Sequence, residues 1–114
     1  MTDHDDRVYL NHIVDAAREI IAFSSERARS DLNTDRLYVL GMTRLVEIIG
    51  EAATRLSDAT RLKIKDIPWP QIISARNRLI HGYDKIDLDI LWNIIILDIP
   101  PLIERLENFM HEED

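Results

Sequence analysis

The sequence contains no cysteine, and only three of its 114 residues are glycine and four are proline. Without cysteine the chain can form neither a disulfide framework nor a thiolate metal site, which excludes the disulfide-stapled class of small secreted proteins. Long apolar runs are missing as well, because the longest, residues 94–97, is far too short to cross a bilayer. The first six residues lack the basic start and apolar stretch of a signal peptide. We therefore expect a soluble, cytoplasmic protein with no membrane partner.

A length of 114 residues, of which 46% are apolar, is close to the common size of one domain. A chain of this length can bury about two-thirds of the surface of its unfolded form, so a core is possible without disulfides or metal. The sequence shows no internal repeat, linker or low-complexity tract. We predict a single domain over residues 1–114.

Positive charge is scarce overall, with a net charge of −7, but it is concentrated in one segment. Residues 61–85 carry six basic and two acidic side chains, a local charge of +4, whereas the rest of the chain carries −11. A protein this acidic is not a general nucleic-acid binder, because neutralising phosphates requires a positive field. The basic segment by itself can still hold one phosphate chain.

Apolar residues recur every three to four positions, which together with the scarcity of glycine and proline predicts an all-α fold. We expect an antiparallel bundle of about five helices, over residues 5–28, 35–56, 58–65, 68–81 and 87–109.

Capping and breaking residues set these boundaries. Residues 30–35 form a polar break, and Asp35 or the threonine before it caps the second helix. Gly82 is the natural end of the fourth helix, and Asp87 caps the fifth. Pro100 and the proline after it must kink or split the fifth helix, since proline removes a hydrogen bond and clashes with the preceding turn.

The second expected helix is apolar on two sides, which usually means burial on two sides. In so short a chain, we expect one side to contact another subunit, giving a homodimer that also involves the fourth helix. Gly41 and Gly50 each cost about 1 kcal/mol inside a helix relative to alanine, so close helix approach is the expected compensation. The first side comprises Leu37, Gly41, Leu45, Ile48, Ala52 and Leu56, and the second Val39, Met42, Val46, Ile49 and Ala53.

Candidate chemistry is concentrated in residues 76–83, at the expected end of the fourth helix. Arg76 has a permanently charged planar side chain that suits phosphate, and histidine exchanges protons readily near neutral pH, which suits His81 to proton transfer. Both suit phosphodiester cleavage. Asn77 lies four residues before His81 on the expected helix, so it can touch and orient the imidazole. Tyr83 projects from the following loop.

Simpler roles for these residues are also open. Positive side chains near a helix C-terminus interact favourably with the helix dipole, so Arg76, Arg78 and His81 can be ordinary helix-end charges. Tyr83 can simply cover the end of the helix.

In its motif the chain resembles the HEPN superfamily, whose R-x4-H-x-Y pattern is matched by Arg76, His81 and Tyr83. Asn77 matches the polar residue that commonly follows the arginine. The flanking segments that resemble the HepT-like branch of this superfamily are residues 47–52, 67–73 and 91–100. The resemblance extends over nearly the whole chain, roughly residues 7–109.

This resemblance implies a homodimeric, all-α HEPN fold in which the motifs of two subunits face a shared cleft. Members of the HepT-like branch are toxins of toxin–antitoxin pairs and act as metal-independent ribonucleases, so no cofactor is expected. By position, Arg76 would stabilise the scissile phosphate, His81 would transfer a proton as the RNA 2′-hydroxyl attacks, and Asn77 would assist the geometry. Arg76, Arg78 and Lys85 are expected to bind RNA.

Tyr83 matches the motif tyrosine that a partner antitoxin modifies in this branch. The resemblance implies that an MntA-type minimal nucleotidyltransferase adds AMP groups to it and thereby silences the toxin.

Other polar residues are expected to be structural. No metal site is expected, because the motif contains no evident set of metal ligands. Of the other histidines, His4 lies in an acidic end that is expected to fray, His12 lies near the apolar stripe of the first helix, and His111 belongs to the acidic tail.

Glu47 and Glu51 are spaced so that they share a helix face. They can face the cleft and pair with Arg76 or Arg78, but a surface or interface salt bridge is their expected use.

Two functions from different classes follow. The first is the ribonuclease toxin, which the intact Arg76 and His81 favour. The second is a catalytically silent helical dimer that binds a nucleotidyltransferase partner or a nucleotide with the same basic cleft. The net charge of −7 favours the second, because RNA approaches against an unfavourable field.

Overall fold

The structure is a computed structural model that describes residues 3–83 and 85–113. Within these residues the regular structure is helical, apart from one isolated pair of bridged residues, Ile80 and Ile86. The all-α prediction is therefore confirmed. The elements are α1 (His4–Ser24), α2 (Asp31–Thr34), α3 (Arg36–Arg55), α4 (Asp58–Lys63), α5 (Trp69–Leu79), α6 (Leu88–Asn93), the π-helical segment η1 (Ile94–Asp98) and α7 (Ile99–Glu113).

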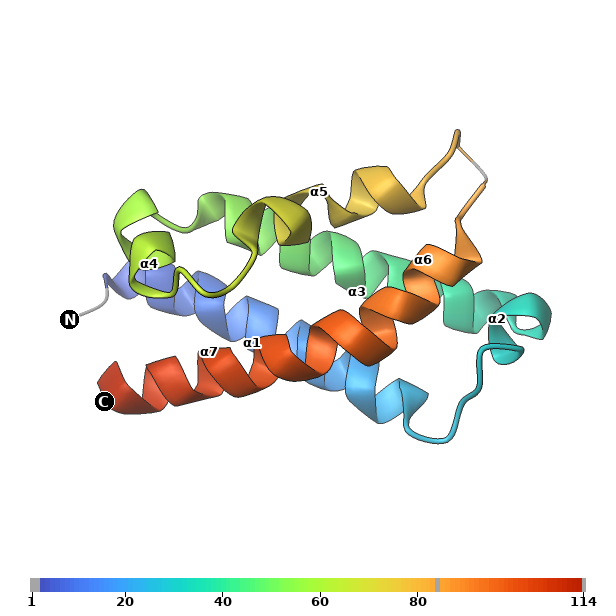
Figure 1. The fold of residues 1–114 in the computed structure, drawn as a ribbon, viewed down its shortest axis with the longest axis horizontal. Coiled ribbons are helices and arrows are strands. Elements are labelled where there is room, and N and C mark those ends of the chain that lie inside the picture. Colours follow the sequence, from blue (N-terminus) through green and yellow to red (C-terminus); the bar gives the residue numbers. More distant parts are fainter. Residues whose placement is uncertain (1–2, 84, 114) are drawn as a thin grey trace.

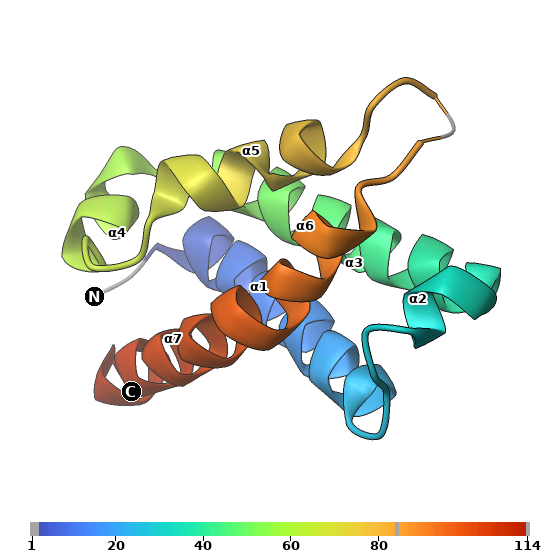
Figure 2. The same ribbon diagram turned by 45° about the vertical axis from the view of Figure 1, so that its right-hand side comes forward.

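Helices α1 and α3 form the antiparallel centre of the bundle (Figure 1). Helix α5 packs on α3, and α7 packs on α1, so that each of these helices runs antiparallel to its neighbour. Figures 1 and 2 place α4, the start of α1 and the end of α7 at one end of the elongated molecule. Helix α2 and the loop after α5 lie at the opposite end.

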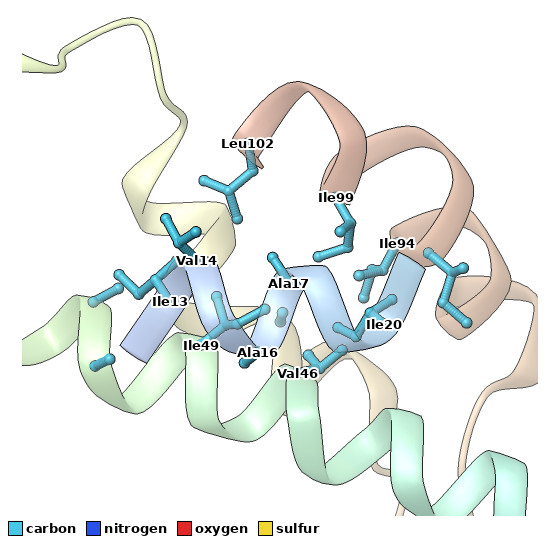
Figure 3. Packing of buried hydrophobic residues seen from close by; sticks show 14 of the residues in the cluster. Ile13, Val14, Ala16, Ala17, Ile20, Val46, Ile49, Ile94, Ile99 and Leu102 are labelled. Atoms are coloured by element: carbon cyan, nitrogen blue, oxygen red, sulfur yellow. The ribbon is translucent and has the colours of Figure 1, made fainter. Parts of the chain in front are cut away.

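The core runs along the apolar stripe of α1, as its three-to-four-residue spacing predicts. Figure 3 shows α1 side chains between α3 on one side and the segment from η1 to α7 on the other. Each of the labelled side chains is buried. They are Ile13, Val14, Ala16, Ala17 and Ile20 from α1, Val46 and Ile49 from α3, and Ile94, Ile99 and Leu102 from the last segment.

Two of the expected helix starts are capped as predicted, and a third is capped as well. The side chain of Asp35 accepts the backbone N–H of Tyr38 at the start of α3, and Asp87 accepts that of Ile90 at the start of α6. Ser57 does the same for α4. Each cap satisfies a backbone donor that the helix leaves unpaired.

Some boundaries differ from the sequence prediction. Helix α1 ends at Ser24 rather than near residue 28, and α4 ends two residues early at Lys63. Within the expected polar break, residues 31–34 form the short helix α2, because Leu32 is buried there and the Asp31 carboxylate accepts the N–H of Ala28 at 2.8 Å. Burial of Leu32 thus favours a helix in a segment whose polar composition predicted a loop.

The expected interruption of the last helix is present, as the π-helical turn η1 immediately before Pro100. Pro100 and Pro101 offer no N–H to the carbonyls of Ile96 and Leu97 four residues earlier. The wider π turn covers these two residues, so the chain passes from α6 into α7 without leaving the bundle.

The two glycines of α3 differ in their surroundings. A Cβ atom at Gly50 would lie 3.3 Å from the backbone oxygen of Ile72 and 3.4 Å from that of Ile73. Gly50 therefore allows α3 and α5 to approach closely, as predicted. At Gly41 an added Cβ would meet no atom within 4 Å among the described residues, so close packing within this chain does not explain it.

No helix in the described part of the chain combines the length and the hydropathy that a bilayer crossing requires.

Candidate functional site

Helix α5 carries most of the motif, and its first residue anchors it. The Trp69 side chain is buried, and its indole N–H donates to the carbonyls of Ile64 at 3.0 Å and Arg61 at 3.2 Å. These bonds fix the start of α5 against the end of α4, which sets the direction in which α5 presents its polar face.

The buried and exposed faces of α5 separate the motif from the core. Ala75 and Leu79 are buried against the bundle. Arg76, Asn77 and Arg78 are exposed. The arginines are therefore available to a ligand and are not part of the core.

The motif histidine does not lie on the helix, contrary to the prediction that the fourth helix continues to residue 81. Helix α5 ends at Leu79, and Ile80 has extended backbone angles of φ −98° and ψ 116°. Asn77 and His81 therefore do not share a helical face, so the predicted contact through i,i+4 spacing is wrong. The cause is the pairing of Ile80 with Ile86 across the loop, which pulls the chain out of the helix.

The loop after α5 closes on itself as a short hairpin. The backbone N–H of His81 donates to the carbonyl of Lys85 at 2.7 Å, and that of Asp87 donates to the carbonyl of Leu79 at 2.8 Å. Gly82 has φ +85°, a conformation that costs a residue with a side chain about 1–2 kcal/mol. Glycine therefore shapes the turn instead of ending the helix. Asp84 lies outside the described residues.

Tyr83 follows this turn, and its side chain is fully exposed. The prediction that it projects from the loop is confirmed. The simpler alternative, that Tyr83 covers the end of the helix, is excluded, because a covering side chain would be at least partly buried.

Arg76 is held by a carboxylate from α3. Its Nε donates to Glu47 Oε2 at 2.8 Å, and the Arg76 side chain remains 54% exposed. Of the two uses that the sequence leaves open for Glu47, the structure shows the pairing with Arg76. Glu51 pairs instead with Arg55 on its own helix, at 3.1 Å. Because Glu47 engages Nε, the terminal nitrogens of the guanidinium keep donors for an anion.

A carboxylate also lies near the side chain of His81. Its Nε2 lies 3.7 Å from Asp87 Oδ2, and its side chain is 61% exposed. The two groups can form an ion pair when the imidazole carries a proton, and the distance is too long for a hydrogen bond. The sequence predicted only the capping role of Asp87. Its second role depends on the hairpin, and we find no signal of that pairing in the sequence.

Arg78 points to a different part of the molecule. Its guanidinium donates to the carbonyl of Gln71, seven residues earlier on α5, at 3.1 Å. It also acts on Asp98 of η1, where partial burial raises the pKa of the carboxyl and the positive charge of Arg78 opposes this rise. The structure thus places Arg78 near η1, while Arg76 pairs with α3 and His81 with the start of α6.

The remaining histidines do not form a site. His4, His12 and His111 are exposed on α1 and α7, and the ring of His12 packs edge-on against Tyr9 with centroids 6.1 Å apart. Across residues 3–83 and 85–113, no group of three or more histidine, cysteine, aspartate or glutamate side chains is placed to hold a metal ion.

Comparisons with known proteins agree with this arrangement. The profile of the family described as "Ribonuclease HepT-like" matches residues 13–109. A Methanocaldococcus jannaschii protein named "Gamma-glutamylcyclotransferase and putative RNase MJ0434" is 34% identical over 110 residues, which are 96% of this chain and 50% of that protein. The chain thus spans about half the length of this relative.

Two further relatives are matched over nearly their whole length. "Putative RNase MJ1380" of the same organism is 30% identical over 94% of this chain and 98% of its own. "Probable ribonuclease HepT" of Thermococcus cleftensis is 32% identical over 87% of this chain and 90% of its own. No solved structure matches the chain.

The match to the family profile covers most of the chain, including the exposed arginine of α5, the hairpin histidine and the projecting tyrosine. The chain belongs to the HepT-like ribonuclease family.

Proposed function

We propose that this protein is a metal-independent endoribonuclease toxin that is silenced by a nucleotidyltransferase antitoxin. The observation that carries the proposal is the exposure of Arg76 and His81 at one end of α5, each with a carboxylate partner from another element. A charged guanidinium and a side chain that exchanges protons are what cleavage of an RNA phosphodiester needs.

The chemistry assigns one role to each side chain. His81 accepts the proton of the 2′-hydroxyl, whose oxygen attacks the neighbouring phosphorus. The bond from phosphorus to the 5′-oxygen breaks, and that oxygen takes up a proton. The products are a 2′,3′-cyclic phosphate and a 5′-hydroxyl. Arg76 stabilises the negative charge that grows on the phosphate oxygens, while Asn77 helps to position the phosphate and Lys85 holds the strand.

The direct test is cleavage of RNA in EDTA. Wild type should cleave RNA and leave a 2′,3′-cyclic phosphate, whereas His81→Ala should lose activity by a factor of at least about 100, the lower range for a general acid–base group. His111→Ala, in α7, is the matched control and should retain full activity. Melting temperatures should be unchanged for both, because both side chains are exposed.

Two outcomes would contradict this mechanism: activity that requires added Mg²⁺, and activity that survives His81→Ala. Binding of RNA or nucleotide by wild type without any cleavage would instead favour the catalytically silent dimer.

A homodimer is part of the proposal, and the exposed side of α3 supports it. Of the two apolar sides, the one with Val39 and Met42 is buried within the chain, whereas the beginning of the other is open. Leu37 is 81% exposed, and a groove of about 540 Å³ runs beside it, between α3 and Phe23 of α1. Gly41 also lines this groove, where its missing side chain leaves room for a second helix.

Solution scattering or sedimentation tests the dimer. Wild type should be a dimer at micromolar concentration, and Leu37→Glu should shift it towards monomer, because the new charge would be buried in the interface. Leu62→Glu is the matched control, since Leu62 is 71% exposed on α4 at the other end of the molecule. A wild-type monomer, or equal effects of the two substitutions, would refute the α3 interface.

Tyr83 is proposed as the point of control. Of the three tyrosines, Tyr38 is buried with its hydroxyl 2.6 Å from Ser24 Oγ, and Tyr9 is partly buried, whereas Tyr83 is fully exposed. A phenol is a poor general base at neutral pH, so modification suits Tyr83 better than initiating cleavage.

In this modification the Tyr83 oxygen attacks the α-phosphorus of ATP, pyrophosphate leaves, and the phenol proton is released. The added AMP brings bulk and a negative phosphate beside the positive side chains that bind RNA, so it competes with the substrate.

The test combines Tyr83→Phe with an MntA-type nucleotidyltransferase and ATP. Wild type should gain AMP-sized mass increments on the peptide that contains Tyr83 and lose its nuclease activity. Tyr83→Phe should keep substantial activity and escape silencing. Modification of Tyr9 or Tyr38, or silencing of Tyr83→Phe, would show that the assignment is wrong.

A further inference from the structure

A second groove lies directly beside the motif hairpin. It runs between α2 and the start of α3 on one side and the chain from Lys85 to Leu88 on the other, with a volume of about 560 Å³. This volume is within the range of small-ligand sites. The groove adjoins the motif hairpin, because Lys85 lines the groove and its carbonyl accepts the backbone N–H of His81.

The floor of the groove is apolar and its rim is polar. The floor is made by the buried Leu32 and Val39 and the partly buried Ile86 and Leu88. The rim side chains are Asn33, Thr34, Arg36 and Lys85. A flat apolar surface edged by cations and hydrogen-bonding groups fits a nucleotide, whose base is apolar on its face, polar at its edge and linked to a phosphate.

The rim presents mainly hydrogen-bond donors. The side-chain oxygen of Asn33 already accepts from Arg29 Nη1 at 2.8 Å, which leaves its amide N–H groups as donors. Arg36 and Lys85 have no acceptor atoms in their side chains. Such a rim matches a ligand rich in acceptors and negative charge.

Acidic side chains on the neighbouring elements have partners of their own. Asp31 accepts the N–H of Ala28, Asp35 pairs with Arg27 at 2.9 Å, and Asp89 pairs with Arg29 at 2.8 Å.

From this geometry we infer that the groove binds the next nucleotide along the RNA strand, beyond the two that are joined by the cleaved bond. Its base rests on the apolar floor beside the Asn33 amide, and its phosphate lies between Arg36 and Lys85. This inference rests on the proposed ribonuclease function, and it adds a subsite on α2 and α3 that the motif does not include.

Binding of 2′-O-methyl RNA tests the groove without cleavage, since this RNA lacks the attacking hydroxyl. Fluorescein-labelled dinucleotides and octanucleotides of mixed sequence are titrated against wild type, Arg36→Gln, Asn33→Ala and Lys65→Gln, by anisotropy at several salt concentrations. Lys65 is an exposed control in the segment after α4, at the opposite end of the molecule.

Arg36→Gln should weaken octanucleotide binding roughly tenfold and reduce the slope of log affinity against log salt by about 0.7, the value for one phosphate of a single strand. Asn33→Ala should weaken binding without changing this slope, because it removes no charge. Dinucleotide binding should be equal in all variants, and Lys65→Gln should match wild type. In RNA with 4-thiouridine, cross-links should fall on residues 32–39 and 85–88.

The alternative results separate this subsite from the proposed function. Equal octanucleotide affinities of Arg36→Gln, Asn33→Ala and Lys65→Gln would overturn the groove assignment, even if wild type cleaves RNA in EDTA. Binding with the expected dependence but no cleavage of unmodified RNA would support the groove and refute the nuclease. Absence of any RNA binding would overturn both. Protection of the groove from hydroxyl radicals in an RNA-free dimer would show a protein interface there and overturn the subsite.

Discussion

The two ends of the molecule use polar side chains in opposite ways. At the α4 end, Asp6 of α1 is only 3% exposed. Its carboxylate accepts hydrogen bonds from the Ser57 hydroxyl at 2.5 Å, the Ser57 N–H at 2.9 Å and the Thr60 hydroxyl at 2.5 Å. Every bond of this group is made within the protein, and it joins α1 to the cap of α4.

At the motif end the polar side chains are left open. His81, Tyr83 and Lys85 are exposed, and Arg76 uses one nitrogen for Glu47 while the rest of its guanidinium stays accessible. Buried polar groups must be paired within the protein, whereas exposed ones keep bonding capacity for a ligand. The polar groups that stabilise the fold and the polar groups that stay open to a ligand therefore lie at opposite ends of one bundle.

The largest effect is expected on RNA cleavage, when a side chain at the motif end is removed. Arg76→Ala should lower RNA cleavage by about 100- to 1000-fold, because a preorganised donor to the developing charge is lost. The melting temperature should hardly change, since the side chain is half-exposed. Cleavage assays with matched thermal melts check both parts. A large loss of stability would mean that Arg76 is structural.

Glu47→Gln tests whether Glu47 positions Arg76. It keeps an acceptor for Arg76 Nε but removes the charge, so its loss of cleavage should be smaller than that of Arg76→Ala. Glu51→Gln is the matched control on the same helix and should be active. Equal activities of the two glutamine variants would contradict a positioning role for Glu47.

The next largest effect is expected on stability, when the buried carboxylate at the α4 end is removed. Asp6→Ala should lower the free energy of unfolding by about 2–3 kcal/mol, because donors of Ser57 and Thr60 lose their acceptor. Asp5→Ala, at an exposed neighbouring position, should change it by no more than about 0.5 kcal/mol. Urea denaturation measures both. Nuclease activity of folded Asp6→Ala should equal that of wild type, and a loss there would contradict the separation of the two ends.

A smaller effect is expected from the hairpin. Gly82→Ala places a side chain at φ +85°, which should destabilise this backbone conformation by about 1–2 kcal/mol. The loop is expected to distort in order to relieve this strain. Global stability should fall less than in Asp6→Ala, while cleavage should fall because His81 shifts. Asp5→Ala, at an exposed position at the other end of the molecule, is the control for activity. Full activity of Gly82→Ala would show that the hairpin shape does not position His81.

The smallest effect is a pH dependence. Burial by itself would raise the pKa of Asp6, but hydrogen bonds from Ser57 and Thr60 outweigh it and hold the pKa below its ordinary value. The stabilisation is therefore complete above the ordinary carboxyl pKa and is lost as the pH falls through the lowered value. In urea denaturation, the stability difference between wild type and Asp6→Asn should shrink from about pH 5 towards about pH 2. A constant difference would refute this.

Much of the fold could be predicted because its signals are local. Apolar spacing predicted α1, α3 and the long last segment, and the caps at Asp35 and Asp87 act as predicted. The R-x4-H-x-Y motif and the projection of Tyr83 from its loop could also be predicted from the sequence. Helix α2 was missed because Leu32 is buried by contacts from elsewhere in the fold, which local propensity does not describe.

Local sequence signals specify the long helices, their caps and the presence of arginine, histidine and tyrosine in one short segment. The arrangement of these side chains depends on contacts between distant segments. The pairing of Ile80 with Ile86 ends α5 before His81, and α3 brings Glu47 to Arg76. The reason is physical: helix formation depends on neighbours within four residues, whereas these contacts form only once distant segments have packed.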